Sequence, residues 1–290
     1  MSVFDHIRAE TAEGSSVKRV CALLGVSRSG YYDHMTRRTQ PPPSDDERLV
    51  AKMRAAQSAA NGTYGKRRMH RELVGSGEQV GRRRVGRLMR EHGIVAVQTR
   101  LFHKTTDSEH TLGFAPNLLQ QSFTTHGADR VWVGDITYLW TGEGWCYLAV
   151  LLDLFSRRVV GWAVDEHMRA DLPQRALSRA LQSRSPQPGL IHHSDRGSQY
   201  AAHSYRKLLA TWGVAQSMSG AGNCYDNAVA ESFFASLKKE CISRTALATR
   251  TEAYDAVARY IDGFYNPTRR HSTLGYVSPL RYEQLAALAA

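Results

Sequence analysis

The sequence predicts an α/β domain, built as a mixed sheet flanked by helices, that follows an all-α region. Three observations predict this order. Apolar, β-branched runs alternate with helical periodicity from residue 131 onward, whereas residues 1–97 show helical periodicity alone. Proline-rich and glycine-containing stretches separate these parts. A length of 290 residues suits one sizeable domain and a smaller one.

Residues 17–32 are predicted to form a helix, a glycine-containing turn and a second helix that Ser27 caps. This pattern is typical of a helix-turn-helix, and we expect such a segment over residues 1–38. Its expected core is apolar: Val20, Leu23, Leu24, Tyr31 and Tyr32. Arg28 then stands near the start of the second helix, where a recognition helix contacts DNA. A plain helical hairpin is the alternative, because short patterns of this kind are common.

The prolines of residues 39–44 interrupt any helix and form a first linker. A second helical, helix-turn-helix-like module is expected over residues 45–97, with helical stretches at 45–57, 62–73 and 80–92. The last of these is amphipathic, with Arg83, Arg87 and Arg90 on one face and Val85, Leu88 and Met89 on the other. Contact with the DNA backbone is one interpretation of the basic face, and a solvated charged face is the other.

Residues 98–128 are polar and weakly periodic, and we expect a connector there. The core domain is expected over residues 129–288. Strands are predicted at 131–140, 145–155, 158–165, 190–193 and 215–218, and helices at 172–184, 202–212, 227–241 and 251–264. Three strands joined by short turns, followed by alternating helices and strands, give a mixed sheet.

Three acidic residues occupy informative places in this order. Asp135 lies within the apolar run of the first strand, where a carboxylate is costly to bury without a partner or a metal. Asp195 comes just after the fourth strand, so the two aspartates become neighbours if those strands pair. Glu231 lies on a predicted helix among apolar neighbours. Two plainer interpretations stand beside these: Asp195 as an ordinary turn residue and Glu231 as a solvated helix residue.

Between Asp195 and Glu231 lie 35 residues, and Lys238 stands two helical turns beyond Glu231. Here the chain resembles the DDE transposases, and more narrowly the OrfB proteins of the bacterial insertion-sequence family three. Four blocks carry that resemblance in the right order: Trp132–Tyr138, His193–Tyr200, Ser219–Phe234 and Tyr265–Tyr276. One departure is Gly134, where a bulkier or hydroxylated residue is frequent, and it bears on the local packing.

The resemblance implies a ribonuclease H-like integrase core with a mixed five-stranded sheet. It also implies that Asp135, Asp195 and Glu231 are catalytic and bind two Mg²⁺ ions, with Mn²⁺ as an alternative. Carboxylates suit this role, because Mg²⁺ prefers hard oxygen ligands and completes its shell with water and phosphate oxygen. The implied reaction is DNA cleavage at an element end, followed by strand transfer into target DNA.

Further DNA contacts are expected outside the acids. Lys238 would reach DNA phosphate near the site, with surface solvation as the alternative. The segment of residues 265–276 is basic and aromatic, and its Arg269 and Arg270 could hold DNA or a neighbouring protomer. His192 and His193 close an apolar strand and are expected to pack near Asp195 rather than to bind metal.

Composition agrees with a polyanionic partner. The net charge is +11, and 20 of the 38 Lys and Arg residues lie in residues 1–110. Solubility alone could also explain a positive balance. The four cysteines form no Cys-x-x-Cys pair, which argues against a disulfide framework and a thiolate zinc site. The sequence has no run of about 18 apolar residues and no secretory start, so a cytoplasmic protein without membrane contact is expected.

The resemblance also sets the expected partners. DNA, as element ends and target, is the expected substrate. A homo-oligomer would pair two ends, and an upstream-frame (OrfA) protein or fusion would supply further DNA recognition. Two alternatives stay open: a helix-turn-helix DNA-binding regulator with a non-catalytic integrase-like domain, and a metal-dependent nuclease. The sequence separates the nuclease from the transposase poorly, because cleavage and joining use the same acids.

Overall fold

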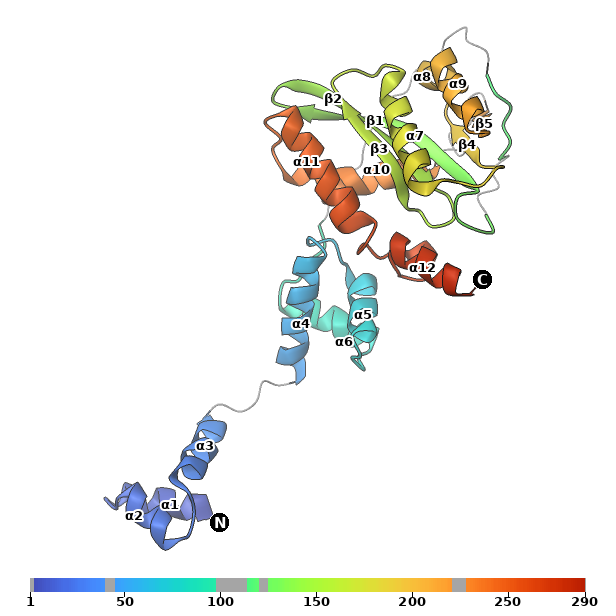
Figure 1. The fold of residues 1–290 in the computed structure, drawn as a ribbon. Coiled ribbons are helices and arrows are strands. Elements are labelled where there is room, and N and C mark those ends of the chain that lie inside the picture. The colour runs from blue at the N-terminus through green and yellow to red at the C-terminus, as the bar shows by residue number, and fades with distance from the viewer. Residues whose placement is uncertain (1–2, 40–44, 98–113, 120–124, 221–227, 290) are drawn as a thin grey trace. The chain divides into compact units, whose positions relative to one another are not determined.

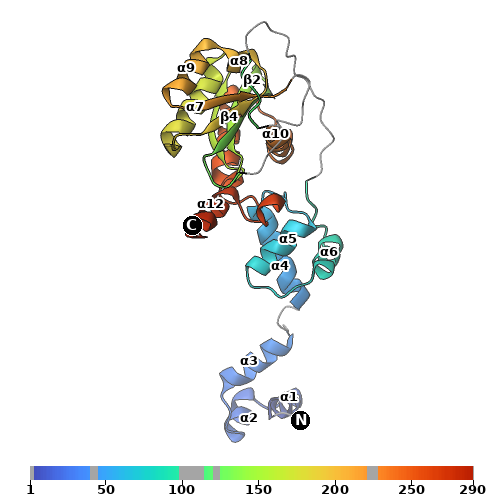
Figure 2. The same cartoon turned by 90° about the vertical axis from the view of Figure 1, so that its right-hand side faces the viewer.

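The computed structural model describes residues 3–39, 45–97, 114–119, 125–220 and 228–289. The chain divides into two compact units, Met1–Met53 and Arg54–Ala290. Figures 1 and 2 show the helices and strands of both units. The structure therefore groups residues 54–97, the greater part of the expected second module, with the sheet in one unit. The expected linker at residues 39–44 lies almost wholly outside the described residues.

The first unit contains three short helices, α1 (Val3–Ala12), α2 (Val17–Leu23) and α3 (Arg28–Thr39), and the first half of α4 (Asp45–Ala59). Ser27 caps α3 as expected, because its Oγ accepts the Gly30 N–H at 3.0 Å. The expected packing is partly wrong. The core of α1 to α3 consists of Ile7, Val20, Cys21 and Tyr31. Leu23 and Tyr32 are 78% and 55% exposed, and Leu24 is also exposed, because α1 supplies the partner surface instead.

The second unit begins with the end of α4 and continues through α5 (Lys66–Gly75) and α6 (Arg82–Glu91). The amphipathic pattern of α6 is confirmed. Its buried side consists of Val85, Leu88 and Met89, and its exposed residues include Arg83, Arg87 and Arg90. Farther along, residues 114–119 of the expected connector run beside the sheet, where the Leu118 N–H donates to Ser217 Oγ at 2.9 Å.

A mixed five-stranded sheet forms the centre of the second unit (Figure 1). Its strands are β1 (Val131–Thr141), β2 (Gly144–Asp153), β3 (Val159–Asp165), β4 (Ile191–Ser194) and β5 (Ala215–Met218). The spatial order is β3-β2-β1-β4-β5. β1 pairs antiparallel with β2 and parallel with β4. All five predicted strands are confirmed, with ends that differ by no more than two residues.

Helices cover both faces of the sheet. α7 (Asp171–Arg184) lies on one face and α10 (Ala228–Glu240) on the other (Figures 1 and 2). The remaining helical elements are α8 (Ser198–Ala201), α9 (His203–Thr211), η2 (Ile242–Arg244), α11 (Arg250–Tyr260), the π-helical turn η3 (Ile261–Tyr265), η4 (Ser272–Leu274) and α12 (Pro279–Ala289). The sequence pattern did not predict α12. Its Glu283 carboxylate accepts hydrogen bonds from Arg158 at 2.7 Å and from Arg184 at 2.9 Å.

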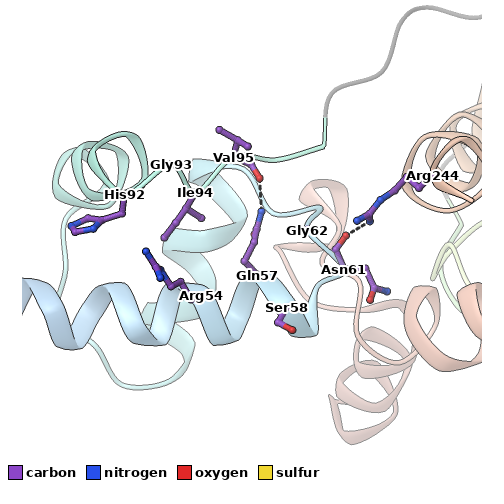
Figure 3. A pocket seen from close by; sticks show the side chains of 10 residues that line it. All are labelled: Arg54, Gln57, Ser58, Asn61, Gly62, His92, Gly93, Ile94, Val95 and Arg244. Atoms are coloured by element: carbon purple, nitrogen blue, oxygen red, sulfur yellow. Dashed lines mark hydrogen bonds between the residues drawn. The ribbon is translucent and has the colours of Figure 1, made fainter.

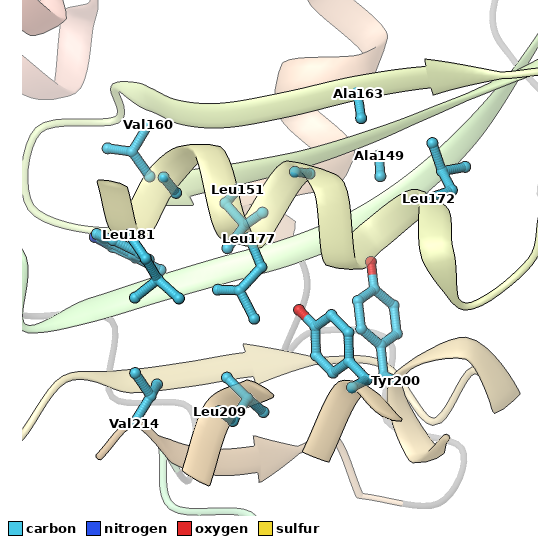
Figure 4. Close-up of a cluster of buried hydrophobic side chains, with 14 of the residues drawn as sticks. Ala149, Leu151, Val160, Ala163, Leu172, Leu177, Leu181, Tyr200, Leu209 and Val214 are labelled. Atoms are coloured by element: carbon cyan, nitrogen blue, oxygen red, sulfur yellow. The ribbon is translucent and has the colours of Figure 1, made fainter. Parts of the chain in front are cut away.

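The main apolar core lies between the sheet and helices α7 to α9 (Figure 4). α7 presents apolar residues at a spacing of three and four, so one stripe of the helix faces the sheet. Its buried members are Leu172, Pro173, Ala176, Leu177, Ala180 and Leu181. Gly161 on β3 allows this approach, since a Cβ there would collide with the Ala176 carbonyl and with Ala180.

In the residues that the structure describes, no helix is both long and apolar enough to span a bilayer. Cys21, Cys146 and Cys241 are free thiols. The fourth cysteine, Cys224, lies in a stretch that is not described.

Candidate active site

The pairing of β1 with β4 brings two of the expected acids together. Gly134 of β1 stands opposite Ser194 of β4 in the parallel ladder. Asp135 follows Gly134 and Asp195 follows Ser194, so both carboxylates start from the same level of the sheet. β4 ends at that point, and the chain turns away into α8.

The Asp135 side chain is half-buried, and its charge is opposed by its surroundings. Burial raises the pKa of this carboxyl well above its ordinary value, and the charge of Asp195 raises it further. A smaller contribution from Glu231 also raises this pKa. The Ile136 N–H, which donates to Oδ1 at 2.8 Å, and the Lys238 ammonium act in the opposite direction. Both other expected acids therefore oppose the charged form of Asp135.

Asp195 is also a turn residue, as the alternative interpretation of the sequence predicted. Its Oδ1 accepts the Gly197 N–H at 2.9 Å, which closes the turn after β4. The Ser194 hydroxyl donates to the Asp195 carbonyl at 2.9 Å within the same turn. The Asp195 side chain thus both closes the turn and presents a carboxylate near Asp135.

α10 supplies Glu231 and Lys238. Glu231 lies in the first turn of the helix and is exposed. Lys238 places its Nζ 4.9 Å from the centre of the Tyr138 ring. Burial lowers the pKa of Lys238 to about 8, although Asp135 favours its charged form. Residues 221–227, just before α10, lie outside the described residues.

The donor set suits a hard divalent cation. Carboxylate oxygens are the ligands that Mg²⁺ prefers, and a cation would offset the burial and the repulsion that raise the pKa of Asp135. Within the described residues, which omit 221–227 just before α10, no three His, Cys, Asp or Glu side chains converge closely enough to hold an ion. Asp195 acts on Asp135 more strongly than Glu231 does. Asp135 is therefore coupled more strongly to Asp195 than to Glu231.

The sequence pattern did not reveal Tyr200 as a neighbour of the acids. Tyr200 is 2% exposed, and burial followed by the charge of Asp135 raises the pKa of its hydroxyl well above the usual range. In the described part of the chain, this hydroxyl has no hydrogen-bond partner. Its position in the His193–Tyr200 block was the only available signal, and it did not distinguish Tyr200 from a core aromatic residue.

The two histidines before Asp195 are buried, and His192 explains the departure at Gly134. A Cβ at Gly134 would lie 2.7 Å from His192 Nε2, so the imidazole occupies the space of a side chain there. His192 Nε2 lies 3.0 Å from the Tyr205 hydroxyl, and His193 Nδ1 lies 2.8 Å from Ser217 Oγ. Burial lowers the pKa of His192 to about 3, which keeps the ring neutral.

The arginines expected to contact DNA differ in their exposure to solvent. Arg28, Arg83, Arg87 and Arg90 are exposed, and Arg87 also pairs with Glu91 at 2.7 Å. Arg269 is only 5% exposed and pairs with Glu240 at 2.7 Å. This burial is not compatible with the DNA contact that we expected for Arg269. Arg270 is half-buried and its charge is paired with Glu72 at 2.7 Å, so a DNA contact is not favoured there either.

A separate cavity with a volume of about 540 Å³ lies between the end of α4, the residues after α6 and η2 (Figure 3). Its basic lining residues are Arg54, His92 and Arg244. The Gln57 side chain donates to the Val95 carbonyl at 2.8 Å, and Arg244 donates to the Asn61 carbonyl. None of the three expected acids lines this cavity, so it is distinct from the candidate active site.

Family models match most of the chain. An integrase core domain model matches residues 125–224, and a second integrase core domain model matches residues 212–279. An HTH-like domain model matches residues 44–102. These matches cover the sheet with its acids and the helical module before it.

Curated relatives are similar over almost their full length. The chain is 45% identical to the insertion element IS600 uncharacterized 31 kDa protein of Shigella sonnei, over 92% of this chain and 100% of that protein. It is 40% identical to the transposase InsF for insertion sequence IS3A of Escherichia coli K12, over 92% and 94%. It is 39% identical to the transposase for insertion sequence element IS904 of Lactococcus lactis, over 86% and 99%.

Among solved structures, the HTLV-2 integrase catalytic core domain in complex with magnesium aligns with a TM-score of 0.43 and 13% identity. That alignment covers 55% of this chain and 99% of the other.

Proposed function

Because the chain belongs to the family of insertion-sequence transposases that includes the IS3 and IS904 proteins, we propose that Asp135, Asp195 and Glu231 are its catalytic acids. The protein is a DNA transposase with an integrase core, an enzyme that cleaves and transfers polynucleotide strands.

The pairing of β1 with β4 is the observation that carries the proposal. It sets Asp135 and Asp195 side by side at the end of a short parallel ladder. The raised pKa of Asp135 adds an electrostatic argument, because burial opposes the charged carboxylate and the charges of Asp195 and, less strongly, Glu231 oppose it further. Such an arrangement destabilises the free protein and is expected where a cation or a reacting group will bind.

We assign Mg²⁺ as the cation, held by Asp135 and Asp195 with Glu231 as a further ligand. When bound, it would stabilise negative charge on the attacking and leaving oxygens of a phosphodiester. Asp135 and Asp195 orient their carboxylates through the Ile136 and Gly197 N–H groups. Lys238 lies beside Asp135, where its ammonium would hold a DNA phosphate.

The reaction then proceeds in two displacements at phosphorus. In the first, water attacks the phosphodiester at the element end, and the 3′ oxygen of the element leaves as a hydroxyl. In the second, that hydroxyl attacks a target phosphodiester, and the 3′ oxygen of the target leaves as the new bond forms. The same carboxylates serve both steps, because each step develops charge on the same kinds of oxygen.

We also propose the partners. Exposed arginines on α3 and α6 would hold the DNA of the element end through its phosphates. A homo-oligomer would pair the two ends of one element. An upstream-frame (OrfA) protein, free or fused, would supply further recognition of those ends.

Strand transfer by the purified protein tests this function. The substrate is an oligonucleotide duplex with the flanking element end, with Mg²⁺, and with or without the upstream-frame product. We expect joined products from the wild type and none from Asp195→Asn. Asp255→Asn is the matched control, because Asp255 is an exposed aspartate of α11 and is not one of the three expected acids. It should join DNA at the wild-type rate.

Other results would favour other functions. Cleavage without joining, abolished in Asp195→Asn, would indicate a metal-dependent nuclease. Specific binding to the element end, with neither cleavage nor joining in any combination, would indicate a helix-turn-helix regulator with a non-catalytic core. Joining that survives in Asp195→Asn would overturn the assignment of the acids.

A further inference from the structure

The segment of residues 265–276 turns charged side chains inward, and Arg269 is the clearest case. Its Nε donates to Glu240 Oε2 at 2.7 Å, and its Nη2 donates to Glu240 Oε1 at 2.7 Å. Nη2 also donates to Ser236 Oγ at 3.0 Å. Glu240 and Ser236 both belong to α10. The segment therefore holds the second half of the helix that begins with Glu231.

A second arginine reaches the same carboxylate from the helical module of residues 54–97. Arg68 lies on α5, with its Nη1 3.6 Å from Glu240 Oε1. The Tyr260 hydroxyl donates to Glu240 Oε2 at 2.8 Å, and Glu240 is only 8% exposed. Two guanidinium groups and a hydroxyl on one buried carboxylate define its position closely. A buried ion pair adds little net stability, so position is the more important consequence.

Other contacts join the same two parts of the unit. They are Arg270 with Glu72 at 2.7 Å, the Tyr64 hydroxyl with the Thr268 carbonyl at 3.2 Å, and the Arg71 guanidinium with the Tyr276 ring centre at 5.5 Å. Each contact runs from the helical module to the segment. We call the segment of residues 265–276, together with Glu240, the seat of the module.

We propose that Arg68 is a positioning residue for Glu231, and that it acts by holding Glu240 at the other end of α10. Nine residue steps separate the two glutamates, and a helix of that length spans roughly 13 Å as one rigid piece. A shift of Glu240 therefore moves Glu231 as well. The inference rests on the proposed function, because the position of Glu231 matters to the reaction only if Glu231 acts in it.

Arg68→Gln tests the proposal, with Arg67→Gln as the matched control. Arg67 is the neighbouring residue on α5, carries the same charge and is exposed. At saturating DNA, Arg68→Gln should lower the maximal cleavage rate by about tenfold or more, because a misplacement of about 1 Å can cost roughly 100-fold. DNA affinity measured without divalent metal should change by less than about threefold, since the effect lies on the maximal rate. Arg67→Gln should leave the maximal rate unchanged.

Arg68→Lys provides a rescue test. The Arg68 contact is a single approach of 3.6 Å, which requires a positive charge rather than a planar fork. The lysine variant should therefore recover most of the maximal rate. A merely structural loss of packing at this position would not follow the charge in this way.

Hydrogen exchange supplies a measurement that needs no catalysis. In Arg68→Gln, the amides of residues 232–240 should exchange faster than in the wild type, while those of α7 should not change. Arg67→Gln should alter neither helix. Should Arg68→Gln fail to fold, Glu72→Gln allows the same comparison, because its pair with Arg270 is partly exposed and its removal also loosens the seat.

Unchanged exchange in α10 would overturn the proposal. An intact maximal rate together with weakened DNA binding would also overturn it, since Arg68 would then be a DNA contact. Faster exchange in α10, in a family of variants whose wild type neither cleaves nor joins DNA, would support the seat and overturn the proposed function instead.

Discussion

Asp135 stands where burial and two other acids oppose a negative charge in the free protein. Its carboxyl is half-buried, and Asp195 and Glu231 repel its charge. A cation at the site would reverse this balance, because it would be attracted by the same carboxylates. The cost of the arrangement should therefore be measurable in the metal-free protein.

Asp135→Asn should raise the melting temperature at pH 7 without divalent metal. The pKa of Asp135 is raised in the folded state, so between the ordinary value of about 3.9 and the raised value the folded chain binds more protons, and stability falls as pH rises. Asparagine removes the charge but keeps an oxygen for the Ile136 N–H. Each kcal/mol gained should appear as roughly 2–4 °C.

Thermal unfolding at pH 7 and at about pH 3.5 checks this expectation, since at the lower pH Asp135 is largely protonated in both states and the gain should vanish. Asp255→Asn, at an exposed position on α11, should change little at either pH. Added Mg²⁺ should stabilise the wild type more than Asp135→Asn. A lower melting temperature for Asp135→Asn at pH 7 would contradict the electrostatic account.

Single residues also show where the sequence was informative and where it was not. Strand order predicted that Asp135 and Asp195 become neighbours if their strands pair, and β1 does pair with β4. Gly134 could be identified as a departure, but not its cause, because His192 fills that space from another strand. The DNA contact predicted for Arg269 is wrong because its partner, like His192, comes from a distant part of the chain. Its basic and aromatic neighbours suggested DNA, while its partner Glu240 lies 29 residues earlier in the chain.

At the scale of elements, periodicity predicted every strand of the sheet and most helices. Among the helices that it missed, α1 and α12 each bury a single residue, Ile7 and Pro279. Neither helix therefore has the apolar stripe that periodicity detects. Ion pairs of Glu283 fix α12 instead, and such pairs leave no periodic signal.

The exposed arginines of α6 are expected to contact DNA phosphates. Combined Arg83→Gln and Arg90→Gln should weaken DNA binding and reduce the slope of log affinity against log salt by about 0.9 for each phosphate that the variant no longer neutralises. Both arginines are exposed on the polar side of a helix whose apolar side is buried. Binding isotherms over a salt series give the slope. Arg281→Gln, at an exposed position on α12, should leave it unchanged, and an unchanged slope in the α6 variant would indicate a merely solvated face.

At the scale of the second unit, Glu240 is the point where four parts of the chain meet. α5, α10, α11 and the segment of residues 265–276 all contribute a group to it or carry it. These interactions explain why residues 54–97 group with the sheet, which sequence patterns within either part could not indicate.

Glu240→Gln should destabilise the second unit by about 3–5 kcal/mol, because it leaves two buried or half-buried guanidinium groups facing each other without a carboxylate. Arg269→Met combined with Glu240→Met should recover part of this stability, since it removes both buried charges. Glu72→Gln should cost less than about 1 kcal/mol, as expected for a more exposed pair. Denaturant titrations measure all three, and equal destabilisation by Glu240→Gln and Glu72→Gln would contradict this account.

The shortness of β4 limits how this enzyme can diverge. β4 has four residues, and β1 continues for seven residues beyond its last pair with β4. Two residues inserted into β4 would carry Asp195 about 6.6 Å along β1, at about 3.3 Å for each residue, and away from Asp135. Insertions and deletions among natural variants should therefore collect in exposed turns such as residues 185–189 and spare residues 190–197.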